Sequence, residues 1–309
     1  MSLADGVVDV RDYPTLRSID AVPADESPLS GGHLWLREFV DGGALRFTMT
    51  GSGLLRFGDA GRTFGDEVPL SYRAAARHVR QSFDRDALRG AVDDPESVTF
   101  FGVATRLQSV PYDFDRLPPF LGTEVARGAE RLPIDAVERI LPRLGLSPVD
   151  AVAKEVHVRD FHPARYEFPG SNWYDGPVAG VVVRNRDGTR ALLPNPAVRD
   201  GDGDGDDDDD DGAGDGATDA FPPGTGTWTG PDPDPDPTAL VEQFLTPERV
   251  RTLADEAGDA DVSTLAERLV EALVREQYAR LYARPSRFDP DAVRAAARRR
   301  ASRLLGEEE

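Results

Sequence analysis

Two apolar runs in the N-terminal half of this sequence are separated by the stretch Glu-Phe-Val-Asp-Gly-Gly at residues 38–43, which is followed by Ala-Leu-Arg-Phe at 44–47. Its Asp-Gly-Gly segment is typical of a turn, because glycine adopts backbone conformations that other residues avoid. Apolar runs lie on both sides of the turn, at Leu34–Leu36 and at 44–47. Short apolar runs bounded by turn residues predict β-strands, so we expect a strand on each side of this turn.

The same pattern of short strands and turns continues to residue 198. Further apolar runs separated by Gly, Asp and Pro lie at 54–57, 98–101, 178–183 and 191–193. Two segments instead place apolar residues at helical spacing, Ser71 to Leu88 and Pro133 to Leu144. Residues 1–198 are therefore predicted to form an α+β domain with mostly antiparallel strands.

Residues 199–237 are predicted to form a disordered acidic linker. Fourteen aspartates and no basic residue occur between residues 200 and 236, and six of the aspartates are consecutive. Such a segment repels itself and has too little apolar surface to pack. Asp202, Asp204 and Asp206 resemble the start of a calcium loop, but the Gly and Glu that complete such a loop are missing. We expect no metal site here.

Residues 238–309 are predicted to form a small helical domain. Thr246-Pro247 is a typical helix start, with a hydroxyl cap and a proline in the first turn. A last helix is expected from Asp289 to Leu305. Nine arginines lie between Arg275 and Arg303, and they fit either a solvated helix face or a phosphate-contacting surface.

The composition of the chain excludes several classes of protein and site. The chain has 309 residues, a net charge of −20, no cysteine and one lysine, Lys154. Without cysteine, disulfides, thiolate catalysis and Cys-ligated metal sites are excluded. No apolar run is long enough to span a membrane, and the first residues do not resemble a signal peptide, so a cytoplasmic location is expected. Acidic sequences that use Arg in place of Lys are typical of halophilic, haloarchaeal proteins.

Five segments in order resemble the motifs of the ATP-dependent RNA ligase family. Residues 38–43 resemble its Glu-Lys-x-Asp-Gly-Gly motif, and Arg46 matches the arginine that follows. The other four segments are similar to its Phe-Gly-Glu-Ala, Glu-Gly-Val-Val and Arg-Ala-Lys-Leu motifs and to its C-terminal helices; they lie at 101–104, 179–182, 190–193 and 244–250. Each match is weak alone, but the shared order is hard to reach by chance.

This resemblance implies a fold and a chemistry. The implied fold is an RNA-ligase-like nucleotidyltransferase, with ATP-grasp-like antiparallel sheets, flanking helices and a small all-α C-terminal domain. In the family, a lysine attacks the α-phosphorus of ATP, a second lysine stabilises the phosphate, and two glutamates hold the ribose and the divalent metal. Phe39, Leu192, Val103 and Ala179 occupy these four positions. We expect no intact catalytic residue, and a pocket that packs without water.

Asp41, Gly42 and Arg46 match the first motif and are the candidate nucleotide-binding residues. Asp41 and Arg46 are expected either to pair with each other or to leave Arg46 free to contact a phosphate. No cofactor is expected, and ATP with Mg²⁺ or Mn²⁺ would be needed only if activity were retained.

Residues outside the motifs offer no substitute site. Lys154 is expected at the surface, and His157 and His162 have no evident third metal ligand. Ser171 and Tyr174 lie in a segment that borders the nucleotide pocket in the family, and turn and packing roles are expected for them.

Three functions remain. The first is a non-catalytic protein that binds RNA or nicked nucleic acid. The second is an active RNA ligase that joins 5′-phosphate and 3′-hydroxyl ends through an AMP intermediate. The third is a regulatory partner of an active ligase paralogue. The lone lysine opposes the second, and a phosphate-contacting arginine surface would favour the first.

Overall fold

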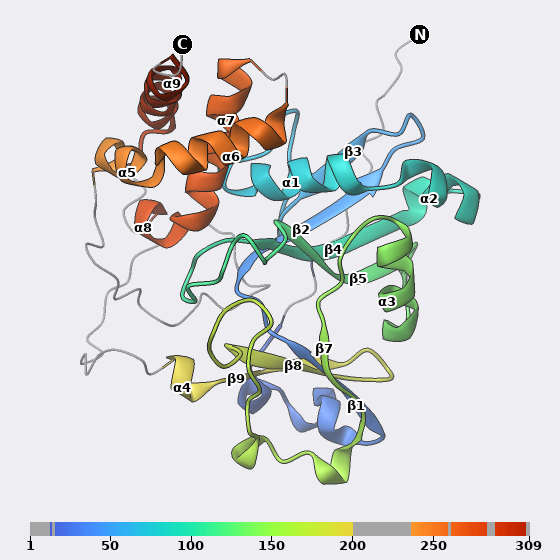
Figure 1. The fold of residues 1–309 in the computed structure, drawn as a ribbon. Helices are drawn as coiled ribbons and strands as arrows, with labels where there is room; N and C mark the ends of the chain where they lie inside the picture. The colour runs from blue at the N-terminus through green and yellow to red at the C-terminus, as the bar shows by residue number, and fades with distance from the viewer. Residues whose placement is uncertain (1–12, 14–15, 200–235, 259–260, 283–287, 307–309) are drawn as a thin grey trace. The chain divides into compact units, whose positions relative to one another are not determined.

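The computed structural model describes residue 13 and residues 16–199, 236–258, 261–282 and 288–306. Figure 1 shows the chain coloured from its N-terminus to its C-terminus. It divides into two compact units, one of residues 1–105 and 110–227, and one of residues 106–109 and 228–309. The predicted linker lies almost wholly outside the described residues, so the predicted domain boundaries stay predictions.

The first unit contains two antiparallel sheets (Figure 1). One sheet has the strand order β7-β1-β8-β9, formed by Ala151–His157, His33–Glu38, Gly180–Asn185 and Arg190–Pro194. The other has the order β3-β2-β4-β5-β6, formed by Leu55–Gly58, Gly42–Met49, Val98–Thr105, Phe120–Arg127 and Glu130–Arg131. Together with the helices, these sheets confirm the α+β fold class.

Helices and short turns accompany the sheets. The α-helices of this unit are α1 Leu70–Ser82, α2 Arg85–Ala91, α3 Ile134–Arg143 and α4 Pro196–Arg199. Single turns of 3-10 helix lie at Ile19–Ala21, Ala24–Glu26, Pro28–Ser30, Pro95–Ser97, Val158–Asp160 and Pro163–Arg165.

The single helix predicted from Ser71 to Leu88 is two helices. Phe83 has an extended backbone conformation and ends α1. Asp84 then caps α2, because its carboxylate accepts hydrogen bonds from the backbone N–H groups of the second and third residues after it. Helical spacing continues across this break, which is why the apolar pattern alone did not reveal it.

An aromatic core lies between the second sheet and its helices. Phe47 on β2 is fully buried and stacks on Phe100 of β4, with 4.8 Å between ring centroids. Phe83, Phe120 and Val79 also belong to this buried cluster. The packed aromatic rings stabilise the sheet against α1 and α3, which lie on it in Figure 1.

Alternation along the strands of the first sheet separates two environments. On β8, Val181 and Val183 belong to an outer apolar cluster. Val182 and Arg184 instead line a cavity whose wall also includes Val103 and Glu124 of the second sheet. Successive side chains of a strand point to opposite faces, so this register turns Arg184 toward the space between the sheets.

The second unit is helical, as predicted. Its helices are α5 Pro237–Phe244, α6 Pro247–Ala257, α7 Val262–Glu276, α8 Tyr278–Tyr282 and α9 Pro290–Gly306. The predicted cap of α6 is confirmed, because the Thr246 hydroxyl accepts a hydrogen bond from the Arg249 N–H at 3.3 Å. Residues 106–109 join this unit, with the Leu107 N–H donating to the Arg275 carbonyl at 2.8 Å.

Two segments differ from the simple pattern of apolar strands and polar turns. Residues 112–115 contain two aromatic residues but form no strand. They bring the buried Tyr112 hydroxyl to the Asp41 N–H, from which it accepts a hydrogen bond of 2.9 Å. Strand β7 was not predicted, because Lys154 and Glu155 interrupt its apolar pattern.

Candidate functional site

The four positions at which the family has ionic residues lie together between the sheets. Phe39 follows β1, Val103 lies on β4 and Leu192 on β9, and all three are buried in one apolar cluster. Ala179 immediately precedes β8 and packs against the same cluster. The Phe39 N–H donates to the Gly180 carbonyl at 2.9 Å, which connects the end of β1 to the start of β8. These four apolar side chains thus share one apolar cluster.

The cavity beside this cluster is small. Its volume is about 60 Å³, which is room for a few water molecules, since one water occupies roughly 10–15 Å³ on this measure. Pockets for drug-sized ligands are roughly 300–1,000 Å³. Apolar side chains form much of its wall, including those of Leu16, Phe39, Val40, Val103, Val149 and Val182. A nucleotide therefore does not fit without rearrangement.

Asp41, Gly42 and Arg46, the candidate nucleotide-binding residues, are all buried. Asp41 and Arg46 are each 1% exposed. An Arg46 guanidinium nitrogen donates to the Ala60 carbonyl at 2.9 Å, which anchors the loop after β3. Gly42 lies where a β-carbon would come within 2.6 Å of both the Ala104 carbonyl oxygen and the Val103 side chain. Close approach of β4 to β2 accounts for this glycine.

Glu38, the first residue of the motif, is also buried. Its carboxylate accepts hydrogen bonds from the Ser171 hydroxyl at 2.6 Å and from the Asn172 N–H at 3.5 Å. Burial raises the pKa of Glu38, and these two hydrogen bonds oppose the rise. Ser171 therefore holds the motif carboxylate, which is a positioning role beyond the turn that we predicted for it. Tyr174 donates its hydroxyl to the Pro177 carbonyl, in agreement with a turn.

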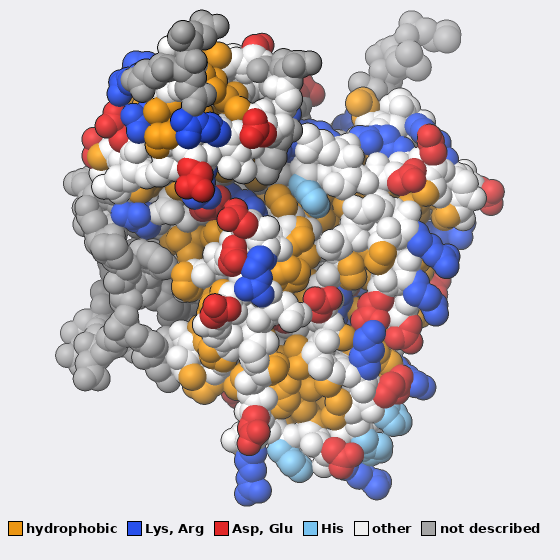
Figure 2. Space-filling view, in the orientation of Figure 1, with side chains coloured by type: hydrophobic (Ala, Val, Ile, Leu, Met, Phe, Trp, Pro, Cys, Tyr) orange, Lys and Arg blue, Asp and Glu red, His pale blue; other side chains and the backbone are white. Residues whose placement is uncertain are grey.

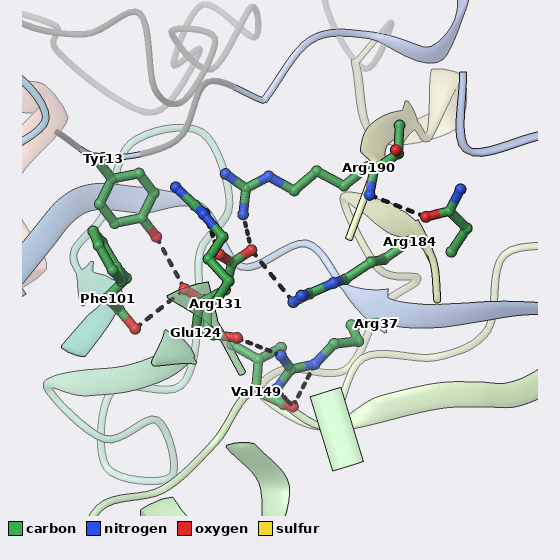
Figure 3. Close-up of polar contacts among 11 residues, drawn as sticks. Tyr13, Arg37, Phe101, Glu124, Arg131, Val149, Arg184 and Arg190 are labelled. Atoms are coloured by element: carbon green, nitrogen blue, oxygen red, sulfur yellow. Dashed lines mark hydrogen bonds and ion pairs between the residues drawn. The ribbon is translucent and has the colours of Figure 1, made fainter. Parts of the chain in front are cut away.

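A cluster of charged residues that the sequence did not point to lies at one end of the cavity (Figure 3). Glu124 of β5 is 3% exposed and pairs with three arginines. Arg131 and Arg190 each place a terminal nitrogen against one carboxylate oxygen, and Arg184 lies 3.5 Å away. Burial raises the pKa of Glu124, but the positive charges of Arg190, Arg184 and Arg131 outweigh it and leave the pKa below its ordinary value.

A fourth arginine, Arg37 of β1, extends this cluster. It is 5% exposed and donates to backbone carbonyls, from Nε to Val149 at 3.0 Å and from Nη1 to Thr123 at 2.9 Å. Burial lowers the pKa of Arg37 to about 10, so the guanidinium stays charged at neutral pH. Beside it, burial raises the pKa of Tyr13 to about 12, and its hydroxyl lies 3.1 Å from the Thr123 hydroxyl.

Lys154 and the histidines lie elsewhere. The Lys154 side chain is half exposed on β7 and pairs with Glu138 of α3. His157 accepts a hydrogen bond from the Arg159 N–H at 3.1 Å, and its ring contacts that of His33 edge to face. Across the described part of the chain, no group of three or more His, Asp or Glu side chains could hold a metal ion.

The arginine cluster has a weak sequence signal that could be recognised in retrospect. Arg184 and Arg190 are paired across β8 and β9 and occupy the same face as Val182 and Leu192. An arginine at an inward position of each of two neighbouring strands is unusual, because charged residues are rarely buried unless paired. Glu124, the carboxylate that pairs with both arginines, lies 60 residues before Arg184 and on the other sheet.

Comparisons with known proteins concern the fold only. No protein-family model matches the chain, and no curated protein matches it. Among solved structures, it is similar to the RNA ligase of Naegleria gruberi with PPi, at 12% identity and a TM-score of 0.45, and to mutants of that ligase with AMP and Mn (12%, 0.45) and with ATP and Mn (11%, 0.46).

These similarities cover 61% of this chain and 56% to 57% of the ligase chains, so the chain spans little more than half of their length. Similarity at this level says nothing of activity, substrate or partner. Separately, none of the helices in the described ranges is long and apolar enough to cross a membrane.

Proposed function

We propose that this chain is a non-catalytic, nucleic-acid-binding protein with the architecture of an RNA ligase. One observation carries the proposal: the four positions that match the ionic residues of the ligase motifs are brought together by the fold, and they are all apolar. Unrelated motif resemblances would not converge on one buried cluster. The convergence supports ligase ancestry, and the residue types oppose ligase chemistry.

The chemistry of covalent nucleotide transfer has no residue to perform it at this site. Phe39 has no lone pair with which to attack the α-phosphorus of ATP. The lone lysine, Lys154 of β7, pairs with Glu138 of α3 and does not line the cavity. Val103 and Ala179 offer no side-chain oxygen to a divalent metal, and the cavity of about 60 Å³ does not admit a nucleotide. The residues present therefore do not fit ATP with Mg²⁺ or Mn²⁺.

Arginines of the helical unit support nucleic-acid binding. Arg298, Arg299 and Arg303 on α9 are exposed. Arg299 and Arg303 are four residues apart and so lie on one face of the helix. Basic side chains are visible over this unit in Figure 2. Exposed guanidinium groups bind phosphates of a nucleic-acid backbone without reading its sequence.

The test combines two measurements on the full chain. The protein is incubated with α-labelled ATP and Mn²⁺ in concentrated KCl, and label on the denatured protein is measured; we expect none. Binding to single-stranded RNA is then measured over a KCl series for the wild type and for Arg299→Gln/Arg303→Gln. The double variant should bind more weakly, with a salt slope shallower by about 1.4, since each phosphate contact contributes roughly 0.7.

A matched control separates a local effect from net charge. Arg159→Gln/Arg165→Gln removes the same charge from exposed positions of the first unit, and it should leave RNA binding unchanged. Labelled protein would reject the non-catalytic proposal and favour an active ligase. Absence of RNA binding, together with co-purification of an active paralogue, would favour the regulatory alternative.

A further inference from the structure

The helix that begins at Val262 is broken at Gln277, and its own sequence gives no reason for the break. Residues 262–282 contain neither glycine nor proline, and their apolar residues keep helical spacing. Sharp breaks in helices arise at proline or glycine, at a bulge, or where another group enters the hydrogen-bond ladder. Gln277 nevertheless leaves the helical conformation, with φ −126° and ψ 19°, and separates α7 from α8. The cause therefore lies outside this segment.

The backbone of Leu107 occupies the break. In a continuous helix the Ala279 N–H would donate to the Arg275 carbonyl, four residues earlier. Instead the Leu107 N–H donates to the Arg275 carbonyl at 2.8 Å, and the Ala279 N–H donates to the Leu107 carbonyl at 2.9 Å. The bond from the Leu281 N–H to the Gln277 carbonyl, at 3.0 Å, is helical again. Leu107 thus replaces one helical hydrogen bond with two of its own, so both helix groups keep a partner.

Side chains hold the inserted segment in place. Arg106 and Leu107 are each 4% exposed. The Arg106 guanidinium lies over the Tyr278 ring, 3.7 Å from the ring centroid, in a cation–π contact. Tyr278 stacks on Tyr282, with 4.5 Å between ring centroids, and the Tyr282 ring contacts that of Phe288, just before α9. One row of contacts therefore runs from the inserted segment through α8 to the start of α9.

We propose that residues 106–109 form a wedge that holds α7 and α8 apart and anchors the helical unit to the end of β4. The wedge follows directly after Thr105, the last residue of β4. It therefore gives the helical unit a connection to the first unit that does not depend on the acidic segment at 199–237. With the wedge withdrawn, the Ala279 N–H bonds to the Arg275 carbonyl, and α7 and α8 become one helix.

This inference goes beyond the proposed function, and its tests need no nucleic acid. A protease site is inserted between residues 215 and 216 of the full chain and cleaved. The two pieces are then analysed by size-exclusion chromatography over a dilution series at constant KCl, and we expect them to elute together. Arg106→Ala/Leu107→Ala should weaken their association at least about thirtyfold, because it removes a buried leucine side chain and a cation–π contact.

Arg116→Ala is the matched control for this measurement. Arg116 lies on the same connection between β4 and β5, and its side chain is 50% exposed. It donates to the Asn172 carbonyl at 2.7 Å and pairs with Asp113 and Asp175, all of which belong to the first unit. Its loss should therefore leave the association of the two pieces unchanged.

A second measurement follows the helix break itself and keeps the test decisive if the double variant is unstable. The chain has no cysteine, so Thr264→Cys/Arg280→Cys places spin labels only on α7 and α8. Adding Leu107→Pro removes the N–H that donates to the Arg275 carbonyl. The labelled positions should then lie about 24 Å apart, since a continuous helix rises about 1.5 Å per residue. With Leu107 in place, the break should give a shorter distance.

Three results would overturn the proposal. The first is that the pieces of the wild type separate on cleavage. The second is that Arg106→Ala/Leu107→Ala associates as tightly as Arg116→Ala. The third is that the distance between the labels is the same with and without Leu107→Pro.

Discussion

Replacing Glu124 by glutamine is the most informative perturbation of the fold. Glutamine keeps the shape of the side chain and removes its negative charge. Glu124 is 3% exposed and is the shared partner of Arg131, Arg184 and Arg190. The variant would leave all three guanidinium groups facing one another without a carboxylate between them.

The magnitude follows from burial. Breaking a buried ion pair by removing one partner costs about 3–5 kcal/mol, because the remaining charge stays buried. Arg184 and Arg190 are nearly as buried as Glu124, so the full range applies to them, whereas Arg131 is 38% exposed and adds little. For a domain of this size, each kcal/mol lowers the melting temperature by roughly 2–4 °C. We therefore expect a fall of about 6–20 °C.

The loss should depend on pH in a defined direction. The folded-state pKa of Glu124 lies below its ordinary value of 4.5. A carboxylate with a lowered folded pKa stabilises the fold fully above its unfolded pKa, and this stabilisation disappears as the pH falls through the folded pKa. The difference between wild type and Glu124→Gln should be complete at neutral pH and should shrink in strongly acidic buffer.

Denaturant unfolding followed by circular dichroism, in phosphate-free buffer, measures this difference. Glu155→Gln is the matched control, because Glu155 makes the same kind of pair with Arg186 while 48% exposed. The control should change the free energy of unfolding by less than about 1 kcal/mol. If Glu124→Gln also lost less than about 1 kcal/mol, the arginine cluster would not be held together by its carboxylate, and the reasoning would fail.

Three further perturbations test the packing and the absent chemistry. Phe47→Ala should cost about 3–5 kcal/mol, since the ring is fully buried and stacked, whereas Leu54→Ala, at a 67% exposed position, should be nearly neutral by denaturant unfolding. Gly102→Ala should cost about 1–3 kcal/mol because its β-carbon collides with an aromatic ring of β5, while Gly65→Ala meets open space. Phe39→Lys should take up no label from ATP, because the metal-binding carboxylates are also missing.

The elements that depend on local chemistry could be predicted from the sequence. The strands at 33–38 and 42–49, the helix within 133–144 and the cap at Thr246 were predicted and are present. The turn expected at Asp-Gly-Gly is absent, because Gly42 and Gly43 are the first two residues of β2. The break at Phe83 was missed, because helical spacing persists across it, and β7 was missed because Lys154 and Glu155 disrupt its pattern. A helix ends where one residue leaves the helical conformation, as Phe83 does, and the spacing of apolar residues does not show where this happens.

The candidate site divides in the same way. The sequence by itself determined which functional groups are absent. Lys154 is the only lysine, and Val103 and Ala179 stand at the two positions where the ligase motifs have glutamates. Chemistry that requires a missing functional group is excluded without knowledge of the fold. Only the tertiary structure decided that Glu124 pairs with Arg131, Arg184 and Arg190. Arg184 and Arg190 belong to one sheet and Glu124 to the other, and residues far apart in the sequence come together where the two sheets pack. Long-range electrostatic partners are set by strand register and sheet packing, and neither can be read from local sequence.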